Sequence, residues 1–482
     1  MKKKYGLFKV LAILILLVVV ATYFFEGRDG SIQILALGDV LLNYIQSFYY
    51  FFDTAIFILI VGGFYGFLNR VPAYKKLVKM IANKVSTKSM VFVIISTIVF
   101  ALLSSLTGFN LLLLLFIPFV VSIILLLGYD KLVALSATIG GSLVGIIGGI
   151  FFTLRDSNTG QFVTFDKFVG LESNWVNVFP RVLLLVVVTG LLIFYIVSHV
   201  KKVNDGKVNY KLTKSDNLFI EVKDRTGKVI KDTVTKVNTI PLIVTLILLL
   251  IILILGYFNW NGLFEIKCFN DFHTWLTGIK IGDYVVYNIL FSPSITAFGT
   301  WAGLGNYMVA MFIVIIIMIV LMLIYRIKFE DAMDGFVLGL KKMLYPTMVA
   351  MLAYCVLVCV FNNGFMETLV TTIGDKVGNN VVIHSLVTLV GSIFNVDVYY
   401  ISTSVFNNII NNLTDSANLS IYSVMFQSVY GLVQLFGPTS ILLIIGLSYL
   451  EVPYKSWLKY IWRFIVELII VILLVLMLVS LL

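Results

Sequence analysis

The chain has 482 residues, of which 60% are hydrophobic and only 12% are charged, with a formal net charge of +10. A typical soluble domain is about a quarter charged, whereas the mean hydropathy here is +1.03. This composition excludes an ordinary soluble protein and predicts an all-α integral membrane protein with one extended membrane domain. The longest polar stretch, residues 201–236, is too short to form a core of its own.

Long apolar runs recur along the chain, each near the roughly 17–25 residues that a helix needs to cross a bilayer. They are residues 7–25, 51–68, 132–152, 182–198, 241–258, 307–324, 345–361 and 464–482. The first run is too long for the apolar region of a signal peptide, so we expect an uncleaved first span. With the shorter apolar pieces between these runs, the sequence predicts about 10–12 membrane segments.

Positive charges gather in alternate loops. Residues 70–88 carry six basic and no acidic residues, and residues 201–236 carry ten basic and five acidic residues. The N-terminus and residues 455–463 are also basic, whereas residues 154–177 and 259–283 are slightly acidic. Under the positive-inside rule, this asymmetry places the N-terminus and the basic loops in the cytoplasm, in a multi-pass protein of the cytoplasmic membrane. It also accounts for the net charge without a nucleic-acid partner.

Residues 89–128 are expected to form a hairpin. The sidedness of the flanking loops requires residues 89–152 to cross the membrane an odd number of times, yet this stretch contains three apolar pieces. The first two pieces, of about 14 and 17 residues, flank the polar sequence SSLTGFN at residues 104–110. Because both arms are at or below the length of a span, a re-entrant hairpin is favoured over two full spans.

The second half of the chain repeats this arrangement with the opposite sidedness. Residues 381–413 form a second hairpin-like region, and residues 419–450 are too long for one straight span and too short for two. Gly437 and Pro438 in the sequence FGPTS predict a broken helix there, because proline removes a backbone donor and clashes with the preceding turn. In the first half, the sequence GGSLVGIIGGIFF contains a candidate break or close-packing point at Gly140, Gly145 and Gly148.

This pattern divides the chain into two repeats of opposite topology. The first transmembrane repeat is expected at residues 1–199, a basic cytoplasmic linker at residues 200–238, and the second transmembrane repeat at residues 239–482. Two opposed hairpins, each followed by a broken helix, are typical of inverted-repeat secondary transporters, whose substrate and coupling-ion sites lie where the repeats meet.

Several stretches resemble the C4-dicarboxylate anaerobic carrier family, the DcuC/YfcC group of the ion-transporter superfamily. The sequence GLSYLEVPYKSWLKYIW, which follows FGPTS, is similar to the closing motif of that family. Other segments of the family are similar to VGGFYGFLNRVPAYKKLVKMI at residues 61–81, IPFVVSIILLLGYDKLVAL at residues 117–135 and CVFNNGFMETLV at residues 359–370. The resemblance extends over residues 61–462.

The resemblance implies an elevator-type secondary carrier, a homodimer in which a scaffold domain holds a mobile transport domain with both hairpins. It implies a small-molecule substrate such as a dicarboxylate, an amino acid or a peptide, driven by Na⁺ or H⁺. The tips depart from the family pattern: Phe109-Asn110-Leu111-Leu112 replaces an acidic pair, and residues 395–404 read NVDVYYISTS. The resemblance therefore does not name the substrate.

Ionisable groups inside a membrane are rare and usually functional. Asp397, at the second tip, is predicted to bind the coupling Na⁺ or H⁺ together with the hydroxyls of Ser402, Thr403 and Ser404. The predicted substrate contacts are polar residues of the tips and of the proline break: Ser105, Thr107, Asn110, Asn407, Asn408, Thr439 and Ser440. The alternatives are local capping of helix ends for the amides and hydroxyls, and a carboxylate wetted by the outer solution for Asp397.

Other polar residues of the apolar segments are assigned structural roles. Asp53 is expected to make a hydrogen bond within the scaffold, Arg181 to anchor a helix at the membrane interface, and His384 to be structural. No cofactor other than a coupling cation, and no metal site, is expected.

The predicted function is secondary active transport of a small organic anion or amino acid across the cytoplasmic membrane, by an elevator-type, Na⁺- or H⁺-coupled mechanism. An integral-membrane enzyme is the first alternative, but the sequence contains no HExxH, GxSxG, paired acidic motif or His/Cys metal spacing. A passive channel fits poorly with inverted halves. A non-transporting receptor or scaffold derived from a carrier stays open, because the hairpin tips are altered.

Overall fold

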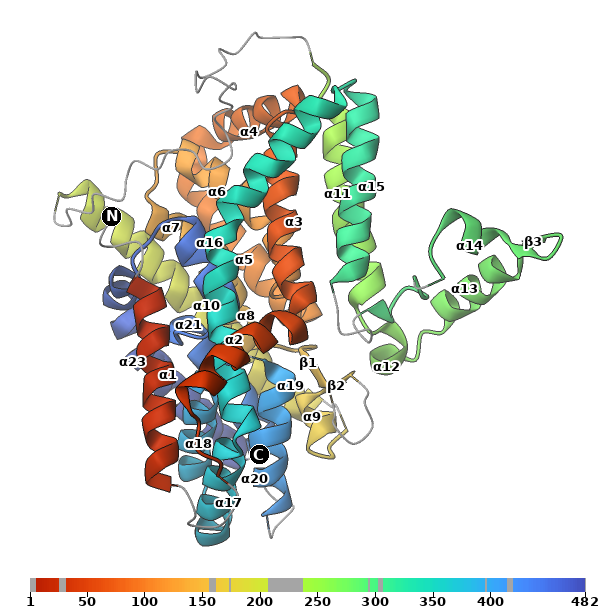
Figure 1. Ribbon diagram of the computed structural model, residues 1–482. Helices are drawn as coiled ribbons and strands as arrows, with labels where there is room; N and C mark the ends of the chain where they lie inside the picture. Colours follow the sequence, from red (N-terminus) through yellow and green to blue (C-terminus); the bar gives the residue numbers. More distant parts are fainter. Residues whose placement is uncertain are drawn as a thin grey trace.

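The computed structural model describes residues 6–25, 32–155, 162–172, 175–206, 237–293, 295–301, 307–394, 397–413 and 419–481. In this part the chain is an elongated bundle of helices with two small two-stranded sheets (Figure 1). Seven of the described helices are long and apolar enough to cross a membrane. The expected all-α membrane fold is confirmed. The basic residues 1–5 and most of the predicted linker, residues 207–236, lie outside the described residues.

The first half of the chain contains helices at the predicted apolar runs and two short strands that the sequence did not predict. In chain order they are α1 (Gly6–Phe25), α2 (Leu37–Tyr50), α3 (Phe52–Leu68), α4 (Pro72–Val85), η1 (Ser86–Lys88), α5 (Ser89–Thr107), η2 (Leu112–Leu115), α6 (Ile117–Leu126), α7 (Lys131–Leu135), η3 (Ser136–Gly140), α8 (Gly141–Ile147), β1 (Thr153–Arg155), β2 (Phe162–Thr164), α9 (Phe165–Phe168) and α10 (Trp175–Asn204). Helices α2 and α3 meet at a bend of 67°.

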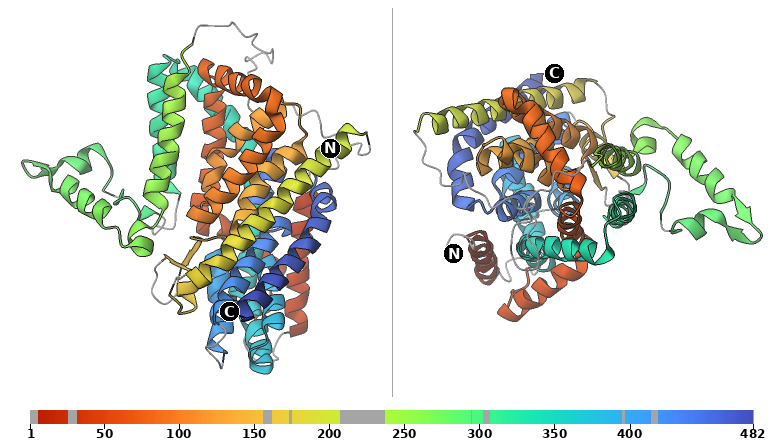
Figure 2. Two further views of the ribbon diagram at one scale, coloured as in Figure 1. Left: turned by 180° about the vertical axis from the view of Figure 1, so that it is seen from behind. Right: turned by 90° about the horizontal axis from the view of Figure 1, so that it is seen from above.

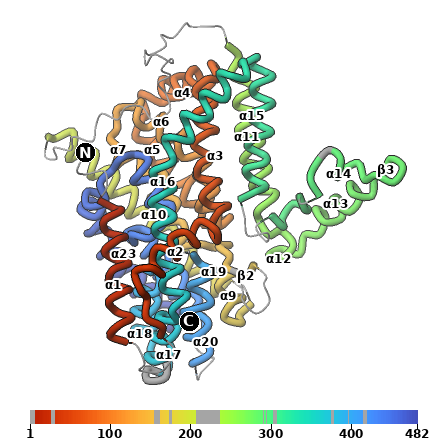
Figure 3. The backbone as a smooth tube through the Cα atoms, viewed as in Figure 1, coloured from red at the N-terminus to blue at the C-terminus, as the bar shows by residue number. Residues whose placement is uncertain are grey.

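The second half adds a lateral arm before its own hairpin and broken helix. Its elements are α11 (Ile240–Tyr257), α12 (Trp260–Phe264), α13 (Cys268–Gly278), β3 (Lys280–Ile281), β4 (Tyr284–Val285), α14 (Val286–Leu290), α15 (Met308–Ile324), α16 (Phe329–Asn362), α17 (Phe365–Val377), α18 (Val381–Phe394), α19 (Val398–Ile401), η5 (Ser402–Phe406), α20 (Asn407–Asn411), α21 (Leu419–Phe436), α22 (Ile441–Tyr449) and α23 (Tyr454–Leu481). The arm from α12 to α14 extends sideways from the bundle in both views of Figure 2. Helices α11 and α15 run side by side at its root (Figure 3).

The two predicted hairpins enter the bundle from opposite ends (Figure 1). The first consists of α5, a tip, and the returning η2 and α6, and its base is closed by a 2.9 Å hydrogen bond between the hydroxyls of Ser89 and Tyr129. Gly108 makes the turn at this tip with φ +70°, a conformation that a residue with a Cβ rarely adopts. The second hairpin consists of α18 and the returning α19 to α20, and tip residues 395–396 lie outside the described residues.

The second half contains the broken helix that the proline predicts. Helix α21 ends at Phe436 and α22 begins at Ile441, with Gly437 and Pro438 in the interruption. The end of α21 is capped from α23, because Trp457 donates from Nε1 to the Leu435 carbonyl at 2.8 Å and Tyr454 donates to the Phe436 carbonyl. The closing motif of the sequence therefore supplies the groups that satisfy the opened backbone.

The first half differs from the expected break at its glycines. Gly140 and Gly145 do not interrupt the helix, which continues from α7 through the π-helical η3 into α8 and ends only at Gly148. Gly145 instead allows close packing, since a Cβ there would lie 2.4 Å from the Ala101 carbonyl oxygen of α5. A Cβ on Gly140 would make only ordinary contacts, the nearest at 3.7 Å. The sequence left two possibilities for these glycines, a helix break or close packing, and Gly145 provides close packing.

Helices α3 and α16 touch along their backbones. A Cβ on Gly66 would lie 2.1 Å from the carbonyl oxygen of Gly335, and a Cβ on Gly339 would lie 1.9 Å from that of Gly62. Such small-residue contacts let membrane helices associate by close van der Waals packing. We call α3 and α16 the seam unit.

A second interlocked set, the core unit, consists of α5, α8, α10 and α21. Besides the contact of Gly145 with α5, a Cβ on Gly148 would lie 2.5 Å from the backbone nitrogen of Leu185 in α10. A Cβ on Gly431 of α21 would lie 2.7 Å from the backbone nitrogen of Ile147 in α8. Helix α18 of the second hairpin packs on α21, and α22 packs on α16, so the two units meet near the hairpins.

A single methyl group at the seam is expected to destabilise the carrier fold. Gly66→Ala places a Cβ into the α16 backbone, and overpacking of this kind costs about 1–3 kcal/mol. The melting temperature of the purified protein in detergent should fall by several degrees. Gly190→Ala in α10 is the matched control, because a Cβ there meets no atom within 4 Å. Equal melting temperatures for the two variants would contradict the close packing of α3 on α16.

Candidate functional site

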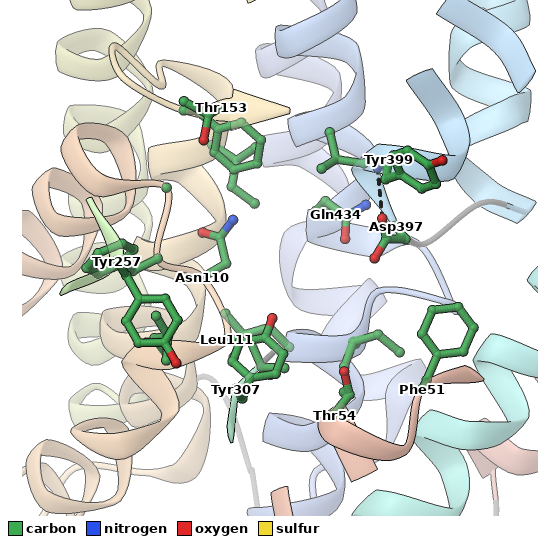
Figure 4. Close-up of a pocket in the computed structure, with 18 of the residues that line it drawn as sticks. Phe51, Thr54, Asn110, Leu111, Thr153, Tyr257, Tyr307, Asp397, Tyr399 and Gln434 are labelled. Atoms are coloured by element: carbon green, nitrogen blue, oxygen red, sulfur yellow. Dashed lines mark hydrogen bonds between the residues drawn. The ribbon is translucent and has the colours of Figure 1, made fainter. Parts of the chain in front are cut away.

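The two hairpin tips, the bend between α2 and α3, and the start of α22 surround one cavity of about 450 Å³ (Figure 4). This volume is within the range of small-molecule sites. The lining residues are Tyr50, Phe51, Asp53, Thr54, Thr107, Gly108, Phe109, Asn110, Leu111, Leu112, Leu143, Ile146, Phe152, Thr153, Phe162, Tyr257, Tyr307, Tyr354, Asp397, Val398, Tyr399, Tyr400, Tyr430, Gln434, Ile441 and Leu442.

The lining is acidic and aromatic. It contains two carboxyl groups, from Asp53 and Asp397, and seven tyrosines. Among these lining residues of the described chain there is no lysine, arginine or histidine. The described lining therefore offers oxygen ligands and aromatic rings, and it contains no cationic side chain.

The two carboxyl groups come from different parts of the fold. Asp397 follows the second tip and caps α19, where its Oδ1 accepts from the backbone N–H of Tyr399 at 2.8 Å. Asp53 lies in the first turn of α3, just after the bend, and the backbone amides of Thr54 and Tyr307 lie against it. Both are only partly buried, because they face the cavity.

The polar amides of the cavity lie on opposing sides. Figure 4 shows Asn110 on one side of the space and Gln434 with Asp397 on the other. The Oδ1 of Asn110 accepts from Ser104 Oγ at 2.5 Å, which directs its NH₂ group away from that bond. The side-chain amide of Gln434 lines the cavity from the opposite side. Two amide groups thus line the cavity.

The three hydroxyls predicted to assist Asp397 do not line the cavity. In the π-helical η5, Ser402 donates to the carbonyl of Tyr399 at 2.7 Å. Thr403 and Ser404 donate to the carbonyl of Tyr400 at 3.0 and 2.7 Å. Hydroxyls of a helix readily bond to carbonyls of the preceding turn, so these three satisfy their own helix in this structure.

Of the predicted substrate contacts, Thr107 and Asn110 line the cavity. Ser105 does not, because it is fully buried and donates to the Gly148 carbonyl at 2.7 Å, where it caps the end of α8. Thr439 lies in the interruption between α21 and α22, and its hydroxyl donates to the Ile393 carbonyl of α18 at 2.6 Å.

The remaining predicted contacts also lie outside the cavity lining. Asn408 donates to the Ser404 carbonyl at 3.0 Å, and Asn407 begins α20 beside it. Ser440 is buried just before α22, and its hydroxyl has no partner among the described residues. Asn408 thus bonds within its own helix, whereas Ser105 and Thr439 bond to the backbone of other helices.

Several cavity residues carry no signal that sequence reasoning used. Asp53 was assigned to the scaffold, but the bend between α2 and α3 turns it into the cavity. Tyr307, Tyr354 and Gln434 lie in or beside apolar helices, where a tyrosine or a glutamine reads as an ordinary packing residue. A polar residue within an apolar run was the only available signal for Gln434.

A sequence profile of the C4-dicarboxylate anaerobic carrier family, DcuC, matches residues 45–480. The chain belongs to this family. It is therefore a multi-pass membrane transporter of the C4-dicarboxylate carrier type, and it is not an enzyme. No curated protein matches the chain. Among solved structures, the chain is similar to the YdaH transporter of Alcanivorax borkumensis, with a TM-score of 0.41 and 12% identity over 98% of this chain and 97% of that one.

A buried ion pair between Arg181 and Asp166 stabilises the helices next to the cavity of this carrier. The guanidinium of Arg181 in α10 binds both carboxylate oxygens of Asp166 in α9, at 2.9 and 2.7 Å. Its other N–H groups donate to the Asn177 carbonyl at 2.8 Å, to Ser423 Oγ at 2.5 Å and to Gln427 Oε1 at 2.7 Å. All five donors of the guanidinium are engaged, so Arg181 holds the fold together and does not offer itself to a substrate anion.

The Arg181 network reaches the cavity through one glutamine. Gln427 of α21 donates from Nε2 to the carbonyls of Ile146 and Gly149, at 3.2 and 2.5 Å, at the end of α8. Ile146 itself lines the cavity. The network therefore fixes both the opened carbonyl end of α8 and one wall of the site.

Breaking this ion pair is expected to destabilise the carrier strongly. Asp166→Ala leaves a buried guanidinium without its carboxylate, a change that typically costs about 3–5 kcal/mol. Replacing both partners, as Asp166→Leu with Arg181→Met, should recover part of the lost melting temperature. Arg463→Met, at an exposed arginine of α23, is the control. An Asp166→Ala variant that melts with the wild type would show that the pair contributes nothing to stability.

Proposed function

We propose that this carrier moves a small carboxylate-type solute across the cytoplasmic membrane, coupled to Na⁺ or H⁺, by an elevator-type movement. The observation that carries the proposal is the cavity between two opposed hairpin tips and the start of a broken helix, with two carboxyl groups and no basic side chain in its described lining. Inverted-repeat carriers place their substrate and ion sites at such a meeting point.

The charge of the lining supports cation coupling. Two like unit charges about 5 Å apart repel by roughly 3 kcal/mol at an effective dielectric constant of 20. A carboxylate solute that enters beside Asp53 and Asp397 therefore needs a cation or a proton to accompany it. Asp397 is the proposed coupling group, because it lies on a hairpin and an unneutralised carboxylate would resist movement through hydrocarbon.

The solute carboxylate has donors in the same cavity. The amides of Asn110 and Gln434 face the space from two sides. The first residues of α22, Ile441 and Leu442, also line it, and the free N–H groups at a helix start attract negative charge. The cavity thus contains hydrogen-bond donors for the carboxylate of the solute and, close to them, the carboxyl groups of Asp53 and Asp397 for the coupling cation. This combination suits an anion that binds together with a cation.

The packing supports movement between two bodies. Backbone contacts interlock α3 with α16 in the seam unit, and others interlock the helices of the core unit, so sliding within either unit would force backbone atoms into one another. Relative movement is easier where ordinary side chains meet, as between the first hairpin and α3, where Tyr65 donates to the Leu115 carbonyl at 2.6 Å. We propose that the core unit and the hairpins move along the seam unit.

The proposed orientation and assembly follow from charge and shape. The basic residues of α4 and the ends of α15 and α11 gather at one end of the bundle, which we place in the cytoplasm together with the N-terminus (Figure 1). We propose a homodimer, in which the arm from α12 to α14 provides contact surface, because it carries exposed apolar residues such as Phe272 and Trp275.

Coupling is tested with Asp397→Asn in proteoliposomes that contain the full-length protein. Uptake of radiolabelled succinate and of a labelled amino-acid mixture is measured with an imposed Na⁺ or proton gradient. The rate of gradient-driven uptake should fall at least tenfold in the variant, and the remaining uptake should no longer depend on Na⁺ or pH. An amide neither binds a proton in this pH range nor neutralises the charge of a cation. Asp271→Asn, on the exposed face of α13, is the control.

Two outcomes of this experiment count against the proposal. Wild-type uptake with unchanged Na⁺ and pH dependence in Asp397→Asn would rule out Asp397 as the coupling group. Failure of the folded wild-type protein to take up any labelled solute would favour the receptor or scaffold alternative.

The elevator movement is tested by linking the two bodies. Cysteines at Tyr65 and Leu115 replace the contact between α3 and the first hairpin, in a background where Cys268, Cys355 and Cys359 are serine. A short thiol cross-linker should stop uptake, and reductive release should restore it. Cysteines at Ser89 and Tyr129 link the two arms of one hairpin and should leave uptake intact. Full activity of the linked 65–115 variant would contradict movement between the units.

A further inference from the structure

We propose that Asp53 and the tyrosines around it form a site for an organic ammonium group, so that the transported solute carries a primary amine. This inference rests on the proposed transport function, which it narrows. It excludes a plain C4-dicarboxylate dianion as the best ligand of this cavity.

The first argument is that the described lining of the cavity has no basic side chain to bind the second carboxylate of a dicarboxylate. Proteins usually recognise carboxylates through the fork of an arginine or the ammonium of a lysine. Neither residue type, nor histidine, is present in the described lining of the cavity. Arg181 lies nearby in the fold but already spends all five of its N–H groups on protein partners. The amides of Asn110 and Gln434 suffice for one carboxylate, and two carboxyl groups remain for positive charge.

The second argument is the aromatic surround of Asp53. The side chains of Tyr257, Tyr307 and Tyr354 line the same cavity and lie within electrostatic range of this carboxyl group. Aromatic rings attract an ammonium group through their electron-rich faces, and tyrosine hydroxyls accept its hydrogen bonds. A small hydrated metal ion needs only oxygen ligands, so a wall of rings is better explained by an organic cation.

The third argument is that these rings are held in place. The ring of Tyr354 stacks on Phe51 with centroids 3.8 Å apart, and that of Tyr307 stacks on Phe57 at 4.8 Å. The hydroxyl of Tyr257 accepts from the backbone N–H of Ala310 at 3.0 Å. Side chains fixed before binding lose little conformational freedom when the ligand arrives. The surround of Asp53 is therefore a built site.

One ammonium group and one coupling ion then neutralise the two carboxyl groups of the protein. In this arrangement the amine of the solute pairs with Asp53, the coupling Na⁺ or H⁺ pairs with Asp397, and the neutral amides bind the solute carboxylate. Asp53 belongs to the seam unit, whereas Asp397 belongs to the second hairpin. The amine is thus selected where the two moving bodies meet.

Binding to the purified full-length protein tests this site. Thermal shifts are recorded with succinate, with each of the twenty common amino acids and with cadaverine. We expect one or more of the amines to stabilise the protein at a concentration at which succinate does not. For the best amino acid, the analogue that lacks only the amino group should bind at least tenfold more weakly.

The Asp53→Asn variant makes the test specific. It should weaken the binding of the amine at least tenfold while leaving the binding of the des-amino analogue unchanged, so that the preference for the amine disappears. Asp271→Asn should keep that preference, because it lies on the exposed arm. If Asp53→Asn lowers the melting temperature without ligand, Tyr307→Phe, which removes one hydroxyl beside Asp53, should still reduce the preference.

The failures of the two proposals are distinguishable. Stabilisation and uptake of succinate, with no response to any amine, would overturn the ammonium site and leave the transport proposal intact. An amine preference that survives in Asp53→Asn would also overturn the assignment of the site to Asp53. Absence of both binding and uptake for every compound would overturn the transport proposal as well.

Discussion

Every backbone group that leaves a helix inside the bilayer must find a partner within the protein, because the hydrocarbon offers none. This carrier interrupts its helices at the centre of the fold, and each interruption is met by side chains from another segment. Ser105 and Gln427 satisfy the carbonyl end of α8. Tyr454 and Trp457 satisfy that of α21. The carbonyl ends of α8 and α21 are therefore paired within the protein, and the start of α22 faces the cavity.

The same constraint explains how the halves are joined. Thr439 ties the broken helix to α18 of the second hairpin, and Ser105 ties α8 to α5 of the first. Glycines then bring the backbones of these helices into contact, since lipid gives helices no hydrophobic reason to associate. The result is two interlocked sets of helices, the seam unit and the core unit, and the cavity is lined by residues of both and of the hairpin tips.

Charged side chains inside the fold are of two kinds: some are paired with one another, and others line the cavity. Arg181 and Asp166 neutralise each other and fill all donors of the guanidinium, which is how a buried charge is tolerated. A second pair, His199 and Asp130 at 2.7 Å, ties α10 to the turn before α7. Asp53 and Asp397 are partly buried and have no such counter-charge among the described residues that line the cavity.

The sequence by itself determined the class of protein and much of its plan. Run lengths and loop charges predict the helices, and Pro438 marks the break between α21 and α22. These features are local, because they depend on chain length, on charge and on the missing N–H of one residue. Helix α5, with 19 residues, is longer than the predicted first arm of about 14 residues. Gly145 shows the limit, since a glycine that serves a break and one that serves packing look alike in sequence.

Only the tertiary structure decided the content of the site. The bend between α2 and α3 brings Asp53 into the same cavity as Asp397, which is far away along the chain. Ser402, Thr403 and Ser404 follow Asp397 closely in sequence but bond to their own helix, and Arg181, a charged residue near a membrane interface, proves to be a buried partner of Asp166. The direction in which a side chain points depends on contacts between segments that are distant in the sequence. A single amino-acid sequence does not reveal those contacts.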